Sequence, residues 1–219
     1  MPDLAPDLAS RIEHSLLRPD ATRAEIETLC REAIEHRFHG VCVYGSRVVE
    51  ASQLLQETNL KLITVVGFPT GALETDVKRF ETEAAIDNGA HEIDAVINLG
   101  WLKEGNHRAI VRELRDIVEA ADERIVKVIL ETGLLTRDEK VLACELVKEA
   151  GANFVKTSTG FCPVHGTVED VRLLRETVGP KFGIKASGGI RDHVTALAMV
   201  EAGANRIGTS NGPAILAAR

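Results

Sequence analysis

A single-domain (β/α)8 barrel is the fold that this sequence of 219 residues predicts. Eight short apolar runs alternate with longer segments whose apolar residues recur at helical spacing. The runs are nearly continuous in apolar residues, as in strands of a parallel sheet that helices cover. No linker rich in proline, serine or glycine divides the chain, so we expect one domain over residues 1–219, with residues 1–10 as a short leader.

The predicted elements follow one another in strict alternation. Strand candidates cover residues 12–17, 41–44, 62–68, 92–99, 125–131, a run through Lys156, 182–187 and 206–209. Helices are expected to begin at Thr22 and Thr136, each followed three residues later by the glutamate of a capping box. The other helix candidates cover residues 48–56, 76–87, 106–121, 167–177 and 192–202.

Two further patterns refine this prediction. Glycines 40, 89, 151 and 203 each stand just before an even-numbered strand, and a glycine suits the left-handed position that ends a helix. In the helix over residues 76–87, we expect Val77, Phe80, Ala84 and Ala85 to form the buried face. Eight repeated units favour the closed barrel, and an open doubly wound sheet is the alternative.

Composition excludes several classes of function. Apolar residues make up 44% of the chain and the formal net charge is -7, which argues against nucleic acid or an anionic membrane as the main partner. No apolar run is long enough for a membrane span and the N-terminus lacks a signal-peptide layout, so we expect a cytoplasmic protein. Neither the four cysteines nor the seven histidines show zinc-site spacing, so neither a metal nor a cofactor is expected.

Lys156 lies in an apolar, β-favouring run that ends in Thr157-Ser158-Thr159-Gly160. Burying an ammonium group is unfavourable, and a buried lysine responds with a lowered pKa that makes its amine a nucleophile. The alternative is an edge lysine whose charged end reaches water.

Strand alternation brings other charged residues into the phase of Lys156. Asp94, Lys127 and Lys185 should also face the barrel interior, on neighbouring strands. Ammonium groups about 5 Å apart repel by about 3 kcal/mol at an effective dielectric constant near 20. This repulsion would lower the pKa of one lysine from about 10.4 towards about 8, while a carboxylate keeps the neighbouring lysine charged. The pattern predicts imine chemistry on Lys156, with Asp94 and Lys185 moving protons through a water.

A phosphate site is expected at the same end of the barrel. Gly188-Gly189 follows the seventh strand, and Gly208-Thr209-Ser210 follows the eighth. Loops at these two places commonly bind phosphate through backbone N–H groups. Thr157 is a further substrate-binding candidate, because it offers a hydroxyl group next to Lys156. The substrate should be a phosphorylated aldehyde or sugar.

These motifs together resemble deoxyribose-phosphate aldolases, a class I aldolase family, over residues 12–212. The segments that carry the resemblance are 65–69, 92–98, 127–132, 154–160, 185–190 and 206–210. The resemblance implies a metal-free, homo-oligomeric enzyme, a dimer or tetramer. It would interconvert 2-deoxy-D-ribose 5-phosphate with acetaldehyde and D-glyceraldehyde 3-phosphate in deoxyribose phosphate catabolism.

The resemblance also implies roles for single residues. Lys156 matches the Schiff-base lysine, and Asp94 matches the proton-relay aspartate. Lys185 matches the lysine that perturbs the nucleophile, and Lys127 matches a further site lysine. The positions that match the family's phosphate site are Gly160, Gly188, Gly189, Gly208 and Ser210.

The chain departs from the family pattern at four places. Glu13 stands where an aspartate is usual, and its extra methylene should push the carboxylate deeper and so disturb Lys185. Gly45 replaces a usual proline, Asn211 replaces a usual serine, and the chain ends at Arg219 without the terminal tyrosine of many members. Rate or substrate range could therefore differ.

Two alternatives stay open. One is another Schiff-base barrel aldolase, of the transaldolase or keto-deoxy-phosphogluconate type. The other is a non-catalytic barrel that binds phosphosugars. Cys42, on an inner strand, is expected in the core, with reaction towards aldehyde products as a minor alternative.

Overall fold

The computed structural model describes residues 8–217, and within them eight parallel strands form a closed barrel. The strands are β1 (Ile12–Leu16), β2 (Gly40–Val43), β3 (Lys61–Val66), β4 (Glu92–Val96), β5 (Ile125–Ile129), β6 (Phe154–Lys156), β7 (Gly183–Ser187) and β8 (Arg206–Thr209). β1 pairs with β2 on one side and with β8 on the other. This pairing excludes the open sheet and confirms the predicted barrel.

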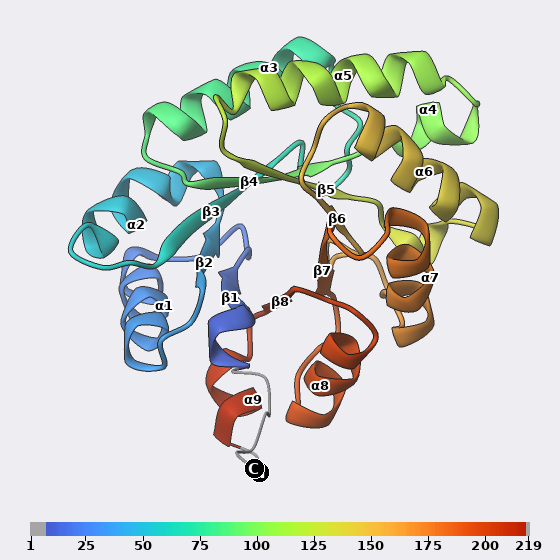
Figure 1. The fold of residues 1–219 in the computed structure, drawn as a ribbon. Helices are drawn as coiled ribbons and strands as arrows, with labels where there is room; N and C mark the ends of the chain where they lie inside the picture. Colours follow the sequence, from blue (N-terminus) through green and yellow to red (C-terminus); the bar gives the residue numbers. More distant parts are fainter. Residues whose placement is uncertain (1–7, 218–219) are drawn as a thin grey trace.

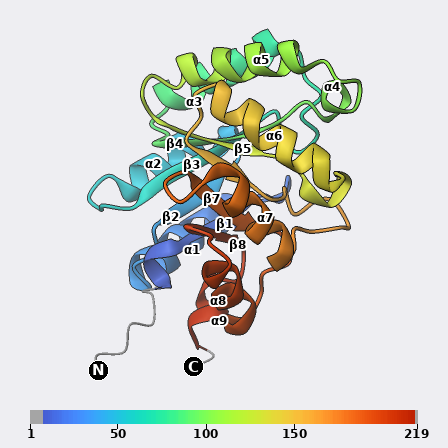
Figure 2. The same cartoon turned by 45° about the vertical axis from the view of Figure 1, so that its right-hand side comes forward.

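Helices surround the barrel on its outside (Figure 1). They are α1 (Arg23–Glu35), α2 (Val48–Leu55), α3 (Thr75–Asp87), α4 (Leu99–Lys103), α5 (His107–Ala120), α6 (Arg137–Glu149), α7 (Val168–Val178), α8 (His193–Glu201) and α9 (Gly212–Ala217). Short 3-10 helices cover Ala9–Arg11, Gly45–Arg47 and Thr132–Leu134. In the view turned by 45°, α8 and α9 lie together beside β1 and β8, the place where the barrel closes (Figure 2).

The expected capping boxes begin two of these helices. Thr22 and Glu25 form both reciprocal bonds at the start of α1, and Thr136 and Glu139 do the same at α6. A third box at α7 pairs Thr167 with Asp170. Each box satisfies backbone N–H groups that a helix start leaves without partners.

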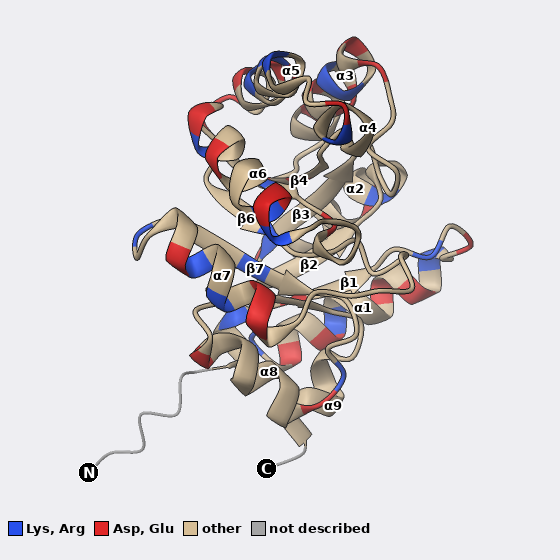
Figure 3. Ribbon diagram, turned by 90° about the vertical axis from the view of Figure 1, so that its right-hand side faces the viewer, with Lys and Arg blue, Asp and Glu red and all other residues tan. Residues whose placement is uncertain are grey.

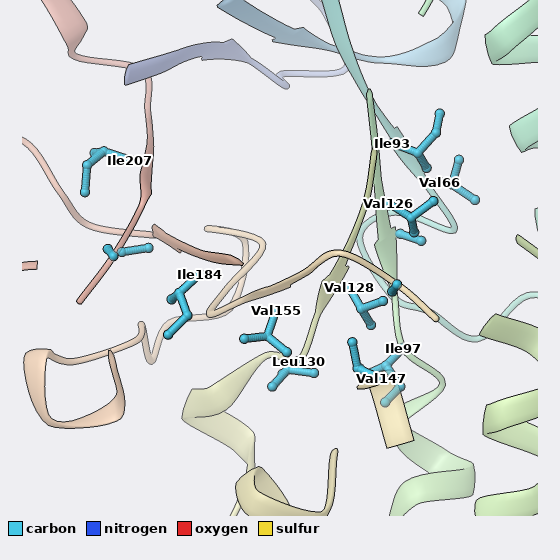
Figure 4. Close-up of a cluster of buried hydrophobic side chains, with 14 of the residues drawn as sticks. Val66, Ile93, Ile97, Val126, Val128, Leu130, Val147, Val155, Ile184 and Ile207 are labelled. Atoms are coloured by element: carbon cyan, nitrogen blue, oxygen red, sulfur yellow. The ribbon is translucent and has the colours of Figure 1, made fainter. Parts of the chain in front are cut away.

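Alternation along the strands separates two packed regions. Outward-facing residues such as Ile93, Val128 and Ile184 pack against the helices, and Figure 4 shows part of this layer. A smaller apolar cluster of Cys42, Ile63 and Val65 lies inside the barrel. Most charged residues lie on the outer helices (Figure 3). A further group of charged residues lies inside the barrel and forms the candidate site.

The prediction of four left-handed glycines is right for three and wrong for Gly40. Gly89, Gly151 and Gly203 have φ values of 102°, 87° and 116°. Gly40 is instead the first residue of β2, and Arg37 adopts the left-handed conformation in that connection, with φ 54°. Gly40 is needed for a close approach, because a Cβ there would lie 2.0 Å from the Lys61 carbonyl oxygen.

The predicted buried face of α3 is largely wrong. The helix buries Lys78, Thr82 and Ala85, whereas Val77 is 49% exposed and Phe80 70% exposed. Ala84 is half-buried, so only Ala85 of the predicted face is fully buried. The orientation has a physical reason: Lys78 donates to Glu113 on α5 at 2.7 Å, and an ion pair between two buried groups stabilises only this rotation of the helix.

Element ends account for the remaining differences. The fourth strand was expected to run to residue 99 but ends at Val96, because α4 begins at Leu99. The Asn98 side chain accepts a hydrogen bond from the Trp101 N–H at 3.2 Å and begins that helix. Of the predicted leader, residues 1–7 lie outside the described residues, and Leu8 is buried against the barrel. No helix between residues 8 and 217 has both the length and the apolar character that crossing a membrane requires.

Candidate active site

Six ionisable side chains are buried together inside the barrel. They are Glu13, Glu92, Asp94, Lys127, Lys156 and Lys185, and none is more than 3% exposed. Alternation places them inward from β1, β4, β5, β6 and β7, which confirms the predicted phase of Asp94 and the three lysines. Three ammonium and three carboxylate groups compensate one another, which such burial requires.

Asp94 is the centre of this cluster. Its Oδ2 accepts hydrogen bonds from Lys156 Nζ at 2.8 Å and from Lys185 Nζ at 2.6 Å. Its Oδ1 accepts from Lys127 Nζ at 3.0 Å. Register explains the meeting of the first two lysines, because Lys156 and Lys185 are direct partners of neighbouring strands. One carboxylate therefore contacts all three lysines.

Lys127 lies deeper in the barrel, away from the mouth. Its Nζ is 2.5 Å from Glu92 Oε2 and 3.6 Å from Glu13 Oε1. Glu92 also pairs with His39 at 3.2 Å. Glu13, His39 and Glu92 offer ligand atoms within 4.8 Å of one another, which is compatible with a metal ion. The Lys127 ammonium group lies against these same two carboxylates and already supplies the opposing charge.

The Glu13 carboxylate contacts Lys185, the lysine that its extra methylene was expected to disturb. Its Oε2 contacts Lys185 Nζ, and its Oε1 lies 3.9 Å from Arg206 Nε. Glu13 pairs in register with Gly208 on β8. A Cβ on Gly208 would lie 2.9 Å from the Lys185 Cε atom, so only glycine leaves room for this lysine. Lys185 is thus held between two carboxylates, Glu13 and Asp94.

The electrostatics single out Lys156. Burial lowers the pKa of Lys156, the Lys185 ammonium group lowers it further, and Asp94 only partly opposes these effects. Burial acts in the same direction on Lys127 and Lys185, but their neighbouring carboxylates outweigh it and raise both pKa values. Lys156 is therefore the lysine of the cluster that most readily becomes a neutral amine.

The carboxylates stay charged for the complementary reason. Burial alone would raise the pKa of Asp94, but the three lysines hold it well below its usual value. Burial likewise opposes the ionisation of Glu92, whereas the His39 hydrogen bond and Lys127 lower its pKa to about 2.

A cavity of about 220 Å³ opens above the cluster. Lys156, Lys185 and Cys42 are among its lining residues. It is also lined by all five glycine and serine positions predicted for phosphate: Gly160, Gly188, Gly189, Gly208 and Ser210. Three of these glycines have φ values near 90° or 73°, a conformation that lets successive backbone N–H groups converge on an anion.

Three predicted residues do not line this cavity. Asp94 and Lys127 are fully buried and lie among the charged groups of the barrel interior. The Thr157 hydroxyl group donates to the Ser187 carbonyl at 2.9 Å and accepts from the Ser187 N–H at 3.0 Å. Thr157 thereby joins β6 to β7, and in this structure Lys127 contacts Asp94 rather than the cavity.

Sequence reasoning missed several residues of the cavity wall. Arg18, Phe161, His165 and Arg191 all line it, and all lie outside the regular elements. Loops carry no periodicity that would indicate where a side chain points. Chain proximity to predicted glycines could have identified two of these residues, because Phe161 directly follows Gly160 and Arg191 lies two residues after Gly189.

Cys42 lies in the inner core, as expected, and also lines the cavity. Burial raises the pKa of its thiol to about 11. A thiol with that pKa is almost wholly protonated near pH 7 and is a weak nucleophile.

The chain is similar to known aldolases. A model of the DeoC/LacD family of aldolases matches residues 10–218. The chain is 53% identical over 211 residues to the deoxyribose-phosphate aldolase of Alkaliphilus oremlandii, covering 96% of this chain and 95% of that protein. It is 52% identical over 214 residues to that of Thermococcus gammatolerans, again covering 96% and 95%.

Solved structures give the same result. An aldolase named QR15 superposes with a TM-score of 0.93 and 40% identity, covering 96% of this chain and 94% of that one. A tetrameric deoxyribose phosphate aldolase from Aeropyrum pernix superposes with a TM-score of 0.90 and 37% identity, covering 96% and 89%.

Proposed function

The chain belongs to the DeoC/LacD family of aldolases, and from that membership we propose that it reversibly cleaves 2-deoxy-D-ribose 5-phosphate through an imine on Lys156. The products are D-glyceraldehyde 3-phosphate and acetaldehyde. One observation carries the mechanism: Lys156, the cluster lysine whose pKa is lowered, lines a cavity together with the glycine-rich loops after β7 and β8.

The first step is imine formation. The neutral amine of Lys156 attacks the C1 aldehyde of the open-chain sugar, and the carbinolamine loses water to give a protonated imine. The Lys185 ammonium group, held between Glu13 and Asp94, stays charged and keeps the Lys156 amine from regaining a proton too readily.

Carbon–carbon cleavage follows from the electron demand of the imine. The C3 hydroxyl group loses its proton, the C2–C3 bond breaks, and its electron pair moves towards the imine nitrogen. This releases glyceraldehyde 3-phosphate and leaves an enamine of two carbons. Protonation of the enamine at C2 restores an imine, which water hydrolyses to acetaldehyde and free Lys156. Asp94 and Lys185, through a water, transfer these protons.

The phosphate group anchors the other end of the substrate. Gly160, Gly188, Gly189, Gly208 and Ser210 offer backbone and hydroxyl donors to its oxygens. Thr157 and Lys127 act behind the cavity wall: Thr157 holds β6 against β7, and Lys127 holds Asp94 in place. This arrangement requires no metal and no cofactor.

The setting of the enzyme is part of the same proposal. A net charge of -7 and a site for a small anion support a cytoplasmic enzyme of deoxyribose phosphate catabolism without a nucleic-acid partner. The tetramer of the Aeropyrum pernix relative supports a homo-oligomer.

The test is borohydride trapping with acetaldehyde, followed by peptide mass mapping. We expect one ethyl group on the Lys156 peptide, while the peptides of Lys127 and Lys185 serve as internal controls. Labelling of another lysine would overturn the assignment of Lys156. A folded protein that forms an adduct only with pyruvate would point to a different donor, and one that forms none would point to a phosphosugar-binding barrel.

A further inference from the structure

The loop that joins β6 to α7, residues 157–167, is held firmly in place over the cavity. The Ser158 hydroxyl group accepts a hydrogen bond from the Gly166 N–H at 2.9 Å. A Cβ on Gly133 would lie 2.4 Å from the Val164 carbonyl oxygen, so the loop backbone packs tightly there. The residue between these two contacts is His165, which lines the cavity and has no assigned role.

The His165 ring lies directly on the loop that is proposed to bind phosphate. A Cβ on Gly188 would be 3.1 Å from His165 Nδ1, and a Cβ on Gly189 would be 2.8 Å from its Cδ2. Both glycines also have positive φ values and line the cavity, so the ring packs on bare backbone at the cavity wall. His165 is thus next to any anion that these groups bind.

The two ring nitrogens of His165 have different surroundings. Nδ1 is buried and has no hydrogen-bond partner among residues 8–217. A proton on Nδ1 would leave a buried N–H without an acceptor, which is unfavourable. The surroundings therefore favour a proton on Nε2, and Nε2–H can donate to a ligand.

We propose that His165 donates this hydrogen bond to a phosphate oxygen of the substrate and so determines preference for phosphorylated over unphosphorylated sugars. Arg18 and Arg191 line the same cavity as the backbone N–H groups and the Ser210 hydroxyl group, and His165 adds an imidazole donor that packs directly on Gly188 and Gly189. This inference rests on the proposed function for the identity of the substrate, but the anion-binding contact itself can be measured without turnover.

The experiment compares four variants: His165→Ala, His165→Phe, His165→Gln and the control Val164→Ala. Phenylalanine keeps a ring on Gly188 and Gly189 without a donor, and glutamine keeps an N–H donor near the place of Nε2. Val164 is in the same loop, 52% exposed, and is not a cavity residue. The readout is kcat/KM for 2-deoxyribose 5-phosphate divided by kcat/KM for 2-deoxyribose.

We expect the ratio to fall about 10- to 100-fold in His165→Ala and His165→Phe, as for loss of a hydrogen bond to a charged group. His165→Gln should retain it within about threefold, and Val164→Ala should leave it unchanged. A wild-type ratio in His165→Ala, or in His165→Phe, would overturn the proposal, the latter because packing alone would then suffice.

Calorimetric titration with inorganic phosphate separates this inference from the proposed function. We expect weaker binding of phosphate by His165→Ala than by the wild type and Val164→Ala, whether or not acetaldehyde is trapped on Lys156. Equal affinity in all three proteins would reject the His165 contact. Failure of trapping together with a His165-dependent affinity would reject only the aldolase mechanism.

Discussion

Two buried carboxylates, Glu113 in the helix layer and Asp94 in the barrel, respond differently to the same burial. Lys78 pairs with Glu113 at 2.7 Å, and both side chains are fully buried. Burial lowers the pKa of Lys78 and raises that of Glu113, so each group moves towards its neutral form. In the barrel, Asp94 is equally buried, yet its pKa moves the other way.

The difference lies in how many opposite charges each group contacts. Glu113 has one lysine, whereas Asp94 has three, and together they outweigh desolvation. The lysines differ in the same respect, namely in how many carboxylates lie near each Nζ atom. Within the described part of the chain, Lys156 Nζ has one carboxylate within 4 Å, while Lys185 has two. Of the two cluster lysines that line the cavity, Lys156 is the less compensated, which is how a balanced cluster can still contain a nucleophile.

Replacing Lys156 with alanine gives the largest expected effect of this comparison. Turnover of 2-deoxyribose 5-phosphate should fall by at least about 10⁴-fold, because the covalent nucleophile is lost. Steady-state kinetics measure this loss, and circular dichroism checks the fold. Near wild-type activity in a folded Lys156→Ala protein would refute imine catalysis at this residue.

Replacing Lys185 with leucine tests the electrostatic part. We expect turnover to fall about 10²- to 10³-fold, because a proton-transfer group is lost. The Lys185 ammonium group lowers the pKa of Lys156, so its removal should raise that pKa and shift the acid limb of imine formation to higher pH. The rate of acetaldehyde trapping as a function of pH measures the limb. A limb that stays in place would show that Lys185 does not lower the pKa of Lys156.

Replacing Lys78 with methionine should act on stability instead of chemistry. The change leaves the Glu113 carboxylate buried without its partner, and the free energy of unfolding should fall by about 3–5 kcal/mol. The double variant Lys78→Met/Glu113→Leu removes both charges and should recover most of this loss. Urea unfolding measures both. Equal destabilisation of the single and double variants would mean that packing around α3, and not the unpaired charge, dominates.

The smallest effect on stability is expected from a substitution on the exposed face of α3, opposite Lys78. Phe80 is 70% exposed, so Phe80→Gln should change the free energy of unfolding by less than about 0.5 kcal/mol. Ala85→Gln, on the buried face, is the matched contrast and should cost about 1–3 kcal/mol through overpacking. If Phe80→Gln lowered the free energy of unfolding more than Ala85→Gln, then Phe80 would belong to the buried face of α3, as the sequence pattern predicted.

The barrel interior was predictable because strand geometry leaves little choice. Side chains alternate with a period of two, so fixing Lys156 inward also placed Asp94 and Lys185 once the strand order was known. The same certainty did not extend to α3. Hydrophobicity favoured Phe80 as a buried residue, whereas a long-range partner, Glu113, turned Lys78 inward. No local pattern contains that partner.

Side chains on loops were the other part of the site that the sequence did not predict. The glycines of the phosphate loops could be placed because a barrel brings the ends of β7 and β8 together. His165 could not, because its position depends on packing of a loop backbone against Gly133 and Gly188, contacts between segments distant in the chain. Gly40 is a similar case, since its need for glycine arises from a neighbouring strand.

The contact between Glu13 and Lys185 has a consequence for the newly made protein. The two residues are 172 positions apart, and they meet only when β8 pairs with β1. At a synthesis rate of 5–20 residues per second, Glu13 leaves the peptidyl-transferase centre roughly 10 to 30 s before Lys185. While the barrel is still open, a water-exposed Lys156 would have the ordinary lysine pKa of about 10.4 and would be no more reactive towards aldehydes than any other lysine. The enhanced reactivity of Lys156 therefore arises only with the complete fold.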